Sequence, residues 1–455
     1  MNNELNRLDE RSRRDFMSHA ARAFLGVSAG VLTGCGRADE GLQSTSQAGG
    51  APAALVPTDD PTGTLAASQL NNKPTAKSVI YLYMGGGMSH VDTFDPKDDK
   101  GVMAQTETIP TNVDGIRLGH WLEKTARQMD KVAVVNSLSS TQGAHGPGSY
   151  FMHTSYAQRA SIIHPRMGSW ISRLSGPINK NLPAAVFVGQ ESVGGGAGFM
   201  PSKFGALGIA SPDEGLKNSR RPSGVSQDEF NKRLELTSFL DTQFHGKYEL
   251  KEVQAYTDMY KDALKMMSSS DLKGFNIQDE PKSVKARYGE SRFGKGALLA
   301  RRLVEHGVRF VEVRSGGWDM HNNIFDALPE KVGELDTVLS ALLQDLSLRG
   351  MLDETMVVLA TEFGRTPNIS GNAGRNHFPK AFSGLLAGGG IRGGQVYGKT
   401  DKKGANIVEN KVGVPDFNAT IAYGMGLPYN EIVYSPSKRP FTVADTGTPI
   451  VDLFG

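Results

Sequence analysis

Short apolar runs alternate with amphipathic segments along the chain from about residue 77 onward. The runs at residues 78–84, 131–137, 184–188, 308–313 and 356–361 are rich in Val, Ile, Leu and aromatic side chains, a composition that indicates buried strands. Buried strands that alternate with helices are typical of a parallel sheet with helices on its faces. The pattern therefore predicts an α/β fold with a mainly parallel sheet.

Helices are predicted at residues 121–129, 249–267, 297–307 and 334–350, where apolar positions recur with helical spacing. The pattern is mostly helical from about residue 225 to 306, which predicts a helical insertion with outer bounds near 211–306. In the last helix one face collects Leu335, Val338, Leu339, Leu342, Leu343 and Leu346. We interpret this face as core packing, and Gly350 as the stop of the helix.

The first 35 residues have the features of an export signal. Arg13 and Arg14 precede Phe16 and a modestly apolar stretch at residues 20–34, which resembles a twin-arginine signal. The stretch is too short to span a membrane permanently. It ends in Leu-Thr-Gly-Cys, which is similar to the cleavage box of bacterial lipoproteins. We therefore expect Cys35 to carry a lipid.

Cys35 is the only cysteine of the chain, so disulfides and cysteine metal sites are excluded. Residues 36–76 are rich in Ser, Gly, Ala, Pro and Thr, a composition that predicts a loose tether. The predicted organisation is a signal at 1–35, this tether, and one folded domain at 77–455. We expect an exported protein, in the periplasm or cell envelope, that the twin-arginine machinery translocates and a lipid anchors to the membrane.

Composition narrows the class of function. The 455 residues are 38% hydrophobic and 22% charged, and their formal net charge is +2. No basic stripe interleaved with aromatic residues is present, so we expect no nucleic-acid partner.

Polar residues follow four of the predicted strands. Glycine-rich or polar segments begin at residues 85, 139, 314 and 361. In open α/β sheets ligands bind at the carboxyl ends of the strands, so these segments are expected to meet at one site. The candidate residues are Asp92, His145, Asp319, His321, Glu362, Arg365 and His377.

Several of these segments resemble a known bacterial family. The run from Phe275 to Asn323, the segment MLDETMVVLATEFGRTP, and the segment from Gly374 to Asp401 are similar to the family called domain of unknown function 1501. This family belongs to the alkaline phosphatase and sulfatase superfamily. The resemblance extends from residue 78 to the end, and it implies an α/β/α sandwich of the alkaline phosphatase type.

The resemblance also implies roles for individual residues. His145, Pro147, Ser149 and Thr154 are similar to the sulfatase motif C-x-P-S-R and the turn after it, with His145 in the nucleophile's place and Ser155 in place of the turn's glycine. Thr361 to Gly364 resemble the superfamily's S-D-H-G, with a carboxylate kept at Glu362 and Phe363 in place of a ligand histidine. Asp319 and His321 are similar to an aspartate and histidine ligand pair, and His377 resembles the last ligand histidine.

Two positions depart from the superfamily pattern. The aspartate that normally ends the first strand is absent, and Asp92 is the nearest substitute, with Asp95 close behind. Asn376 stands where the family is expected to have aspartate, which lowers the negative charge of the site.

The leading hypothesis is a metal-dependent hydrolase of phosphate or sulfate esters, acting on a small anionic ester or a sulfated or phosphorylated glycan. Its ligands would be Asp92, Asp319, His321, Glu362 and His377, and the cation could be zinc, manganese or calcium. Arg365 could hold a substrate oxyanion or balance the charge of Glu362. The alternative is a catalytically degenerate surface module that binds a glycan or a partner protein.

His145 has three open roles: a nucleophile, a further metal ligand, or a general acid. Neighbouring cations would lower the pKa of an imidazole, which disfavours the acid. We favour ligation slightly, because Phe363 and the missing aspartate leave vacancies that His145 could fill.

Overall fold

The computed structural model describes residues 74–455 except 190–195, 218, 220, 222–223 and 248–261. Its centre is a nine-stranded sheet, with the order β12-β4-β11-β8-β1-β7-β5-β6 and β15 beside β4. Every strand pair in it is parallel except the two pairs made by β11. The predicted mainly parallel α/β fold is therefore confirmed. The predicted signal residues Arg13, Arg14 and Cys35 lie outside the described residues.

The strands predicted from apolar runs are all present. They are β1 (Ser78–Met84), β4 (Val132–Ser139), β5 (Ala185–Val188), β7 (Phe310–Ser315) and β8 (Thr355–Ala360). The other strands of the sheet are β6 (Leu207–Ile209), β11 (Phe382–Ala387), β12 (Gln395–Tyr397) and β15 (Val412–Gly413).

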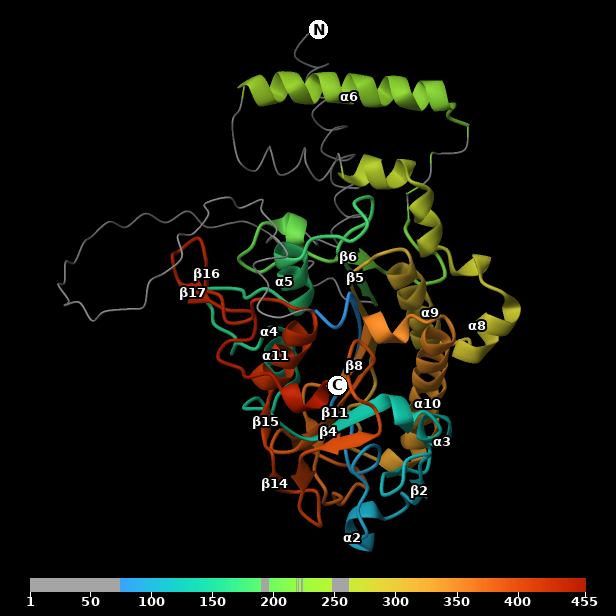
Figure 1. The fold of residues 1–455 in the computed structure, drawn as a ribbon, viewed down its shortest axis with the longest axis vertical. Coiled ribbons are helices and arrows are strands. Elements are labelled where there is room, and N and C mark those ends of the chain that lie inside the picture. The colour runs from blue at the N-terminus through green and yellow to red at the C-terminus, as the bar shows by residue number, and fades with distance from the viewer. Residues whose placement is uncertain (1–73, 190–195, 218, 220, 222–223, 248–261) are drawn as a thin grey trace, which may run out of the picture.

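Alternate residues of β1 face two separate hydrophobic cores. Ile80 and Leu82 belong to the core that contains α9 (Arg292–Glu305) and α10 (Ile324–Leu348). Tyr81 and Tyr83 belong to the core that contains α4 (His145–Thr154), α5 (Met167–Leu174) and α11 (Val414–Gly424). Figure 1 shows these two sets of helices on opposite sides of the sheet. The layers form the expected α/β/α sandwich.

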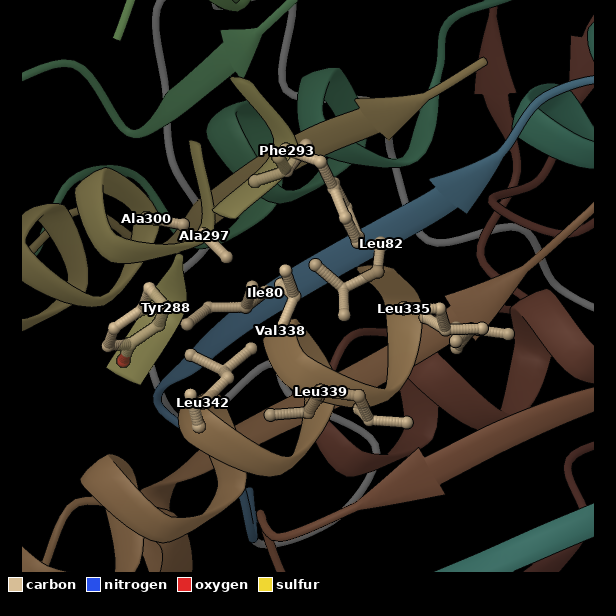
Figure 2. Close-up of a cluster of buried hydrophobic side chains, with 14 of the residues drawn as sticks. Ile80, Leu82, Tyr288, Phe293, Ala297, Ala300, Leu335, Val338, Leu339 and Leu342 are labelled. Atoms are coloured by element: carbon tan, nitrogen blue, oxygen red, sulfur yellow. The ribbon is translucent and has the colours of Figure 1, made fainter. Parts of the chain in front are cut away.

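The leucine-rich face of α10 packs on the sheet, as predicted. Leu335, Val338, Leu339 and Leu342 are at most 1% exposed. Figure 2 shows them against Ile80 and Leu82 of β1, next to side chains of α8 (Lys282–Tyr288) and α9. Burying an aliphatic side chain of this size contributes about 1.5–3 kcal/mol, so this layer stabilises the packing of α10 on β1.

The other helical predictions agree with the structure only in part. The helix expected at residues 121–129 is only α3 (Glu123–Ala126), followed by one 3-10 turn. The one expected at 249–267 lies mostly outside the described residues. The expected insertion contains α6 (Gln227–Lys247), α8 and α9, of which α9 packs on β7 and belongs to the layer that covers the sheet. In the part of the chain that is described, no helix combines the length and the apolar character needed to cross a membrane.

Candidate metal centre

Four strand ends meet at one site, as the sequence predicts. Glu362 follows β8, and its Oε1 accepts a hydrogen bond from the Gly86 N–H after β1 (2.8 Å). The same oxygen lies 2.7 Å from Nδ1 of His145, which opens α4 after β4. Asp319 follows β7, and its backbone lies so close to Gly86, whose φ is +120°, that any side chain at position 86 would clash with it. The glycine turn after β1 thus lets the other strand ends approach.

Three imidazoles surround one oxygen of Asp319. The Nε2 atoms of His321, His145 and His377 lie 2.9, 3.3 and 3.4 Å from Asp319 Oδ1. His321 Nε2 and His377 Nε2 are also only 3.1 Å apart. Within the described residues, His145, Asp319 and His377 form a group whose ligand atoms are all within 4.8 Å of one another.

Each of these rings uses its other nitrogen for an acceptor. His145 Nδ1 faces Glu362 Oε1, His321 Nδ1 lies 3.1 Å from Asn376 Oδ1, and His377 Nδ1 lies 2.9 Å from the Gly143 carbonyl. An acceptor beside Nδ1 holds the ring hydrogen on that nitrogen, so in each neutral ring Nε2 is unprotonated and carries a lone pair. Three lone pairs then converge on a carboxylate oxygen, and they repel one another unless protons or a cation lie between them.

The donor set fits a divalent cation. Imidazole nitrogens and a carboxylate oxygen are common zinc ligands, and ligating histidines usually donate their second N–H to a fixed acceptor. His145 Nε2 is in addition a buried atom with no hydrogen-bond partner among the described residues. His145, His321, Asp319 and His377 are therefore the residues that could hold a metal.

Arg365 holds Asp319 in place. Its Nη2 donates to Asp319 Oδ1 (2.6 Å) and to the Gly86 carbonyl, while Nε donates to the Gly87 carbonyl (2.8 Å). Partial burial opposes the charged form of Asp319, but the Arg365 hydrogen bond and charge, together with His145 and His321, lower its pKa to about 2. Arg365 is fully buried, so the structure gives it a positioning contact with Asp319 and no exposed surface for a substrate oxyanion.

Asp92 is not part of this group. The sequence offered it as a substitute ligand, but it is fully buried in an ion pair with Arg375 (2.7 Å). Ser89 and Thr106 donate to its two oxygens as well. These contacts engage both oxygens of Asp92, and we leave it out of the candidate ligand set.

Glu362 and Phe363 contact the imidazoles and support their positions. Glu362 is 2% exposed, and its second oxygen accepts from the Tyr83 hydroxyl (2.9 Å). Phe363 is fully buried, with its ring 5.1 Å from that of His145 and 4.6 Å from that of His377. Phe363 thus supports two of the three imidazoles by packing.

Tyr83 also contacts the site, although it was not among the residues predicted from the sequence. Burial and then the charge of Glu362 raise the pKa of Tyr83 well above its usual value of 10.0, so its hydroxyl stays protonated and donates. A tyrosine in a buried strand normally finds a partner for its hydroxyl, but the sequence does not distinguish Tyr83 from Tyr81, whose hydroxyl has no partner among the described residues.

A glycine allows the first turn of α4, which begins at His145, to pack closely on the segment after β8. Gly148 lies in the first turn of α4, and a Cβ there would come within 3.2 Å of Glu362 Cβ and 3.3 Å of the Phe363 ring. The helix ends at Ser155, which adopts the left-handed conformation (φ 66°) that glycine favours.

A family model described as "Protein of unknown function (DUF1501)" matches residues 76–454, so the chain belongs to this family. Among solved structures it is similar to Ps i-CgsB, at 10% identity and a TM-score of 0.41 over 83% of this chain and 75% of that one. It is similar to PsFucS1 sulfatase from Pseudoalteromonas sp., at 13% identity and a TM-score of 0.34 over 84% and 74%. The alkaline phosphatase from the Antarctic bacterium TAB5 gives 10% identity and a TM-score of 0.29 over 71% and 95%. No curated protein matches the chain.

Proposed function

We propose that this member of the family is a metal-dependent hydrolase of phosphate or sulfate esters. The observation that carries the proposal is the convergence of three Nε2 atoms on Asp319 Oδ1 at 2.9–3.4 Å. The proposed ligands are Asp319, His145, His321 and His377. When bound, a divalent cation supplies Lewis-acid polarisation of an ester oxygen and stabilises the charge that develops on it.

The residues around the proposed ligands keep them ready for the cation. Arg365 holds Asp319 as a carboxylate, and Glu362, Asn376 and Gly143 hold the hydrogens on the far side of the imidazoles. Of the cations considered, zinc suits a set of three nitrogens and one oxygen better than calcium, which prefers oxygen ligands. His145 serves as a ligand in this arrangement.

We infer the substrate class from the superfamily resemblance. A small anionic ester, or a sulfated or phosphorylated glycan, is the proposed partner. We further propose, from the motifs at Arg13, Arg14 and Cys35, export through the twin-arginine machinery and a lipid anchor, so that the proposed activity would lie in the periplasm or cell envelope.

Elemental analysis of the natively purified protein, combined with a panel of phosphate, phosphonate and sulfate esters, tests the proposal. We expect stoichiometric metal in the wild type and its loss in Asp319→Asn and His321→Ala. His120→Ala is a matched control, because His120 packs on Trp121 (4.0 Å between ring centroids) and contacts Glu107, outside the site. Loss of metal in the control as well would show that the variants act through folding.

A second candidate function is a catalytically degenerate module that binds a glycan or a partner protein. The buried Phe363 ring favours it, because it removes a ligand that the superfamily pattern has at that position. Glu362 also turns both oxygens to other donors. A fully folded protein that holds no metal and hydrolyses none of the esters would favour this module over the hydrolase.

A further inference from the structure

Tyr83, Glu362 and His145 form a chain of hydrogen bonds that leads from the core to the metal centre. The Tyr83 hydroxyl donates to Glu362 Oε2 (2.9 Å), and Glu362 Oε1 faces His145 Nδ1 (2.7 Å). Tyr83 is 1% exposed and Glu362 is 2% exposed, whereas the His145 side chain is 36% exposed. The two buried members are therefore fixed by the fold, and the third depends on them.

The contacts of Glu362 distinguish a positioning residue from a ligand. Oε1 already serves the Gly86 N–H and His145, and Oε2 serves Tyr83, so neither oxygen is directed at Asp319. The first turn of α4 also closes over the side chain, where a Cβ on Gly148 would lie 3.2 Å from Glu362 Cβ. Glu362 cannot turn an oxygen towards Asp319 and the Nε2 atoms without breaking these contacts.

His145 stands between two carboxylates. Glu362 lies 2.7 Å from Nδ1, and Asp319 lies 3.3 Å from Nε2. A neutral imidazole carries one hydrogen, and the closer, buried acceptor holds it on Nδ1. If Glu362 were absent or displaced, the hydrogen would move to Nε2 and bond to Asp319, which would remove the lone pair that a cation needs.

We propose that Tyr83 and Glu362 are positioning residues that hold His145 in the tautomer with hydrogen on Nδ1 and direct its Nε2 lone pair at Asp319. This inference rests on the proposed function in one respect, namely that the lone pair receives a cation. It assigns Glu362 the role of orienting a ligand in place of binding the cation itself, and it adds Tyr83 to the residues of the site.

Nitrogen-15 NMR of histidine-labelled, chelator-treated protein tests the tautomer directly, at a pH above the ordinary imidazole pKa of about 6.5. A His145→Ala variant identifies the signals of His145. We expect a protonated Nδ1 and a bare Nε2 in the wild type, a reversed tautomer in Glu362→Ala, and a mixture in Tyr83→Phe. Tyr81→Phe is the matched control, because Tyr81 lies on the same face of β1 and its buried hydroxyl has no hydrogen-bond partner among the described residues.

Metal affinity, measured by competition with a chelating dye and Zn²⁺, supplies the second measurement. Loss of a group that orients a ligand typically weakens metal binding about 10–100-fold, and we expect Glu362→Ala near the upper end and Tyr83→Phe near the lower end. Tyr81→Phe should bind as the wild type does. If Tyr83→Phe does not fold, Glu362→Ala and the nearly isosteric Glu362→Gln carry the test.

The two measurements separate this inference from the proposed function. A wild-type protein that binds no Zn²⁺ but shows the tautomer change would refute the metal site and keep the positioning roles. An unchanged His145 tautomer in folded Glu362→Ala and Tyr83→Phe would overturn the positioning roles, whatever metal the protein holds.

Discussion

The replacement Asp92→Ala distinguishes a structural aspartate from a metal ligand. Asp92 and Arg375 are both fully buried, and their contact is bidentate, with Arg375 Nε 2.7 Å from Oδ2 and Nη2 3.0 Å from Oδ1. Ser89 and Thr106 donate to the same carboxylate at 2.5 and 2.6 Å. Removing it leaves the Arg375 charge without a counter-ion inside the protein.

Removing one partner of a buried ion pair costs about 3–5 kcal/mol, because the remaining charge stays desolvated. The other hydrogen bonds of Arg375 go to neutral carbonyls, including that of Val102 (2.6 Å), so they satisfy its donors without neutralising it. We therefore expect Asp92→Ala to lower the free energy of unfolding by an amount in this range. The double variant Asp92→Leu/Arg375→Met should lose less, since it leaves no unpaired charge.

Urea unfolding and metal content, measured on the same preparations, check this prediction. Asp92→Ala should be strongly destabilised yet keep its metal at temperatures where it is folded. Asp319→Ala should show the reverse, with depleted metal and a smaller loss of stability in the metal-free state, because the Asp319 side chain is 45% exposed. An Asp92→Ala protein that is as stable as the metal-free wild type but binds no metal would refute the structural role.

Three further predictions follow from the structure and the sequence. Burial, with the charge of Arg159 nearby, lowers the pKa of His164 to about 4, so the unfolded chain binds more protons than the folded one below pH 6.5 and the free energy of unfolding should fall by up to about 3 kcal/mol between pH 6.5 and 4. His164→Gln should flatten this part of the profile of urea midpoint against pH, and parallel profiles for the two proteins would contradict the assignment. Asn376→Asp places a charged acceptor at Nδ1 of His321 and should tighten Zn²⁺ binding about 10-fold in dye competition, so unchanged or weaker affinity would argue against a metal at His321. Cys35→Ala should release the protein from membranes in a fractionation assay without unfolding it, and continued membrane retention would count against the lipid anchor.

Much of the fold follows from local patterns that the core enforces. The run at residues 78–84 is buried along its whole length, and the apolar positions of α10 match the surface of the sheet beneath them. The helix predicted at 121–129 is only α3, and a distant side chain caps its first turn. The N–H groups of Lys124 and Thr125 donate to the carboxylate of Asp336 (3.0 and 2.6 Å). A contact between residues more than two hundred positions apart in the sequence leaves no trace in a local pattern.

The location of the site could be predicted from the sequence, but the roles of its residues could be predicted only in part. Strand ends of a mainly parallel sheet share an edge, so the pattern alone brought His145, Asp319 and Glu362 together. Asp92 was misplaced because it is close in sequence to the turn after β1. In the structure its carboxylate pairs with Arg375, a residue distant in the sequence, and no local pattern shows this pairing.

The role of Glu362 depends on the direction of one side chain. A carboxylate directly after a strand can face the ligands or turn back to the sheet, and the residue type is the same in both cases. What turns it back is the pair of donors behind it, the Gly86 N–H and the Tyr83 hydroxyl, together with the first turn of α4. The donors were visible in the sequence as a glycine turn and a buried tyrosine, but only their arrangement in space shows that both reach the same carboxylate. In proteins where a buried strand carries a tyrosine just before such a turn, the acidic residue at the neighbouring strand end should therefore be tested for a positioning role before it is counted as a ligand.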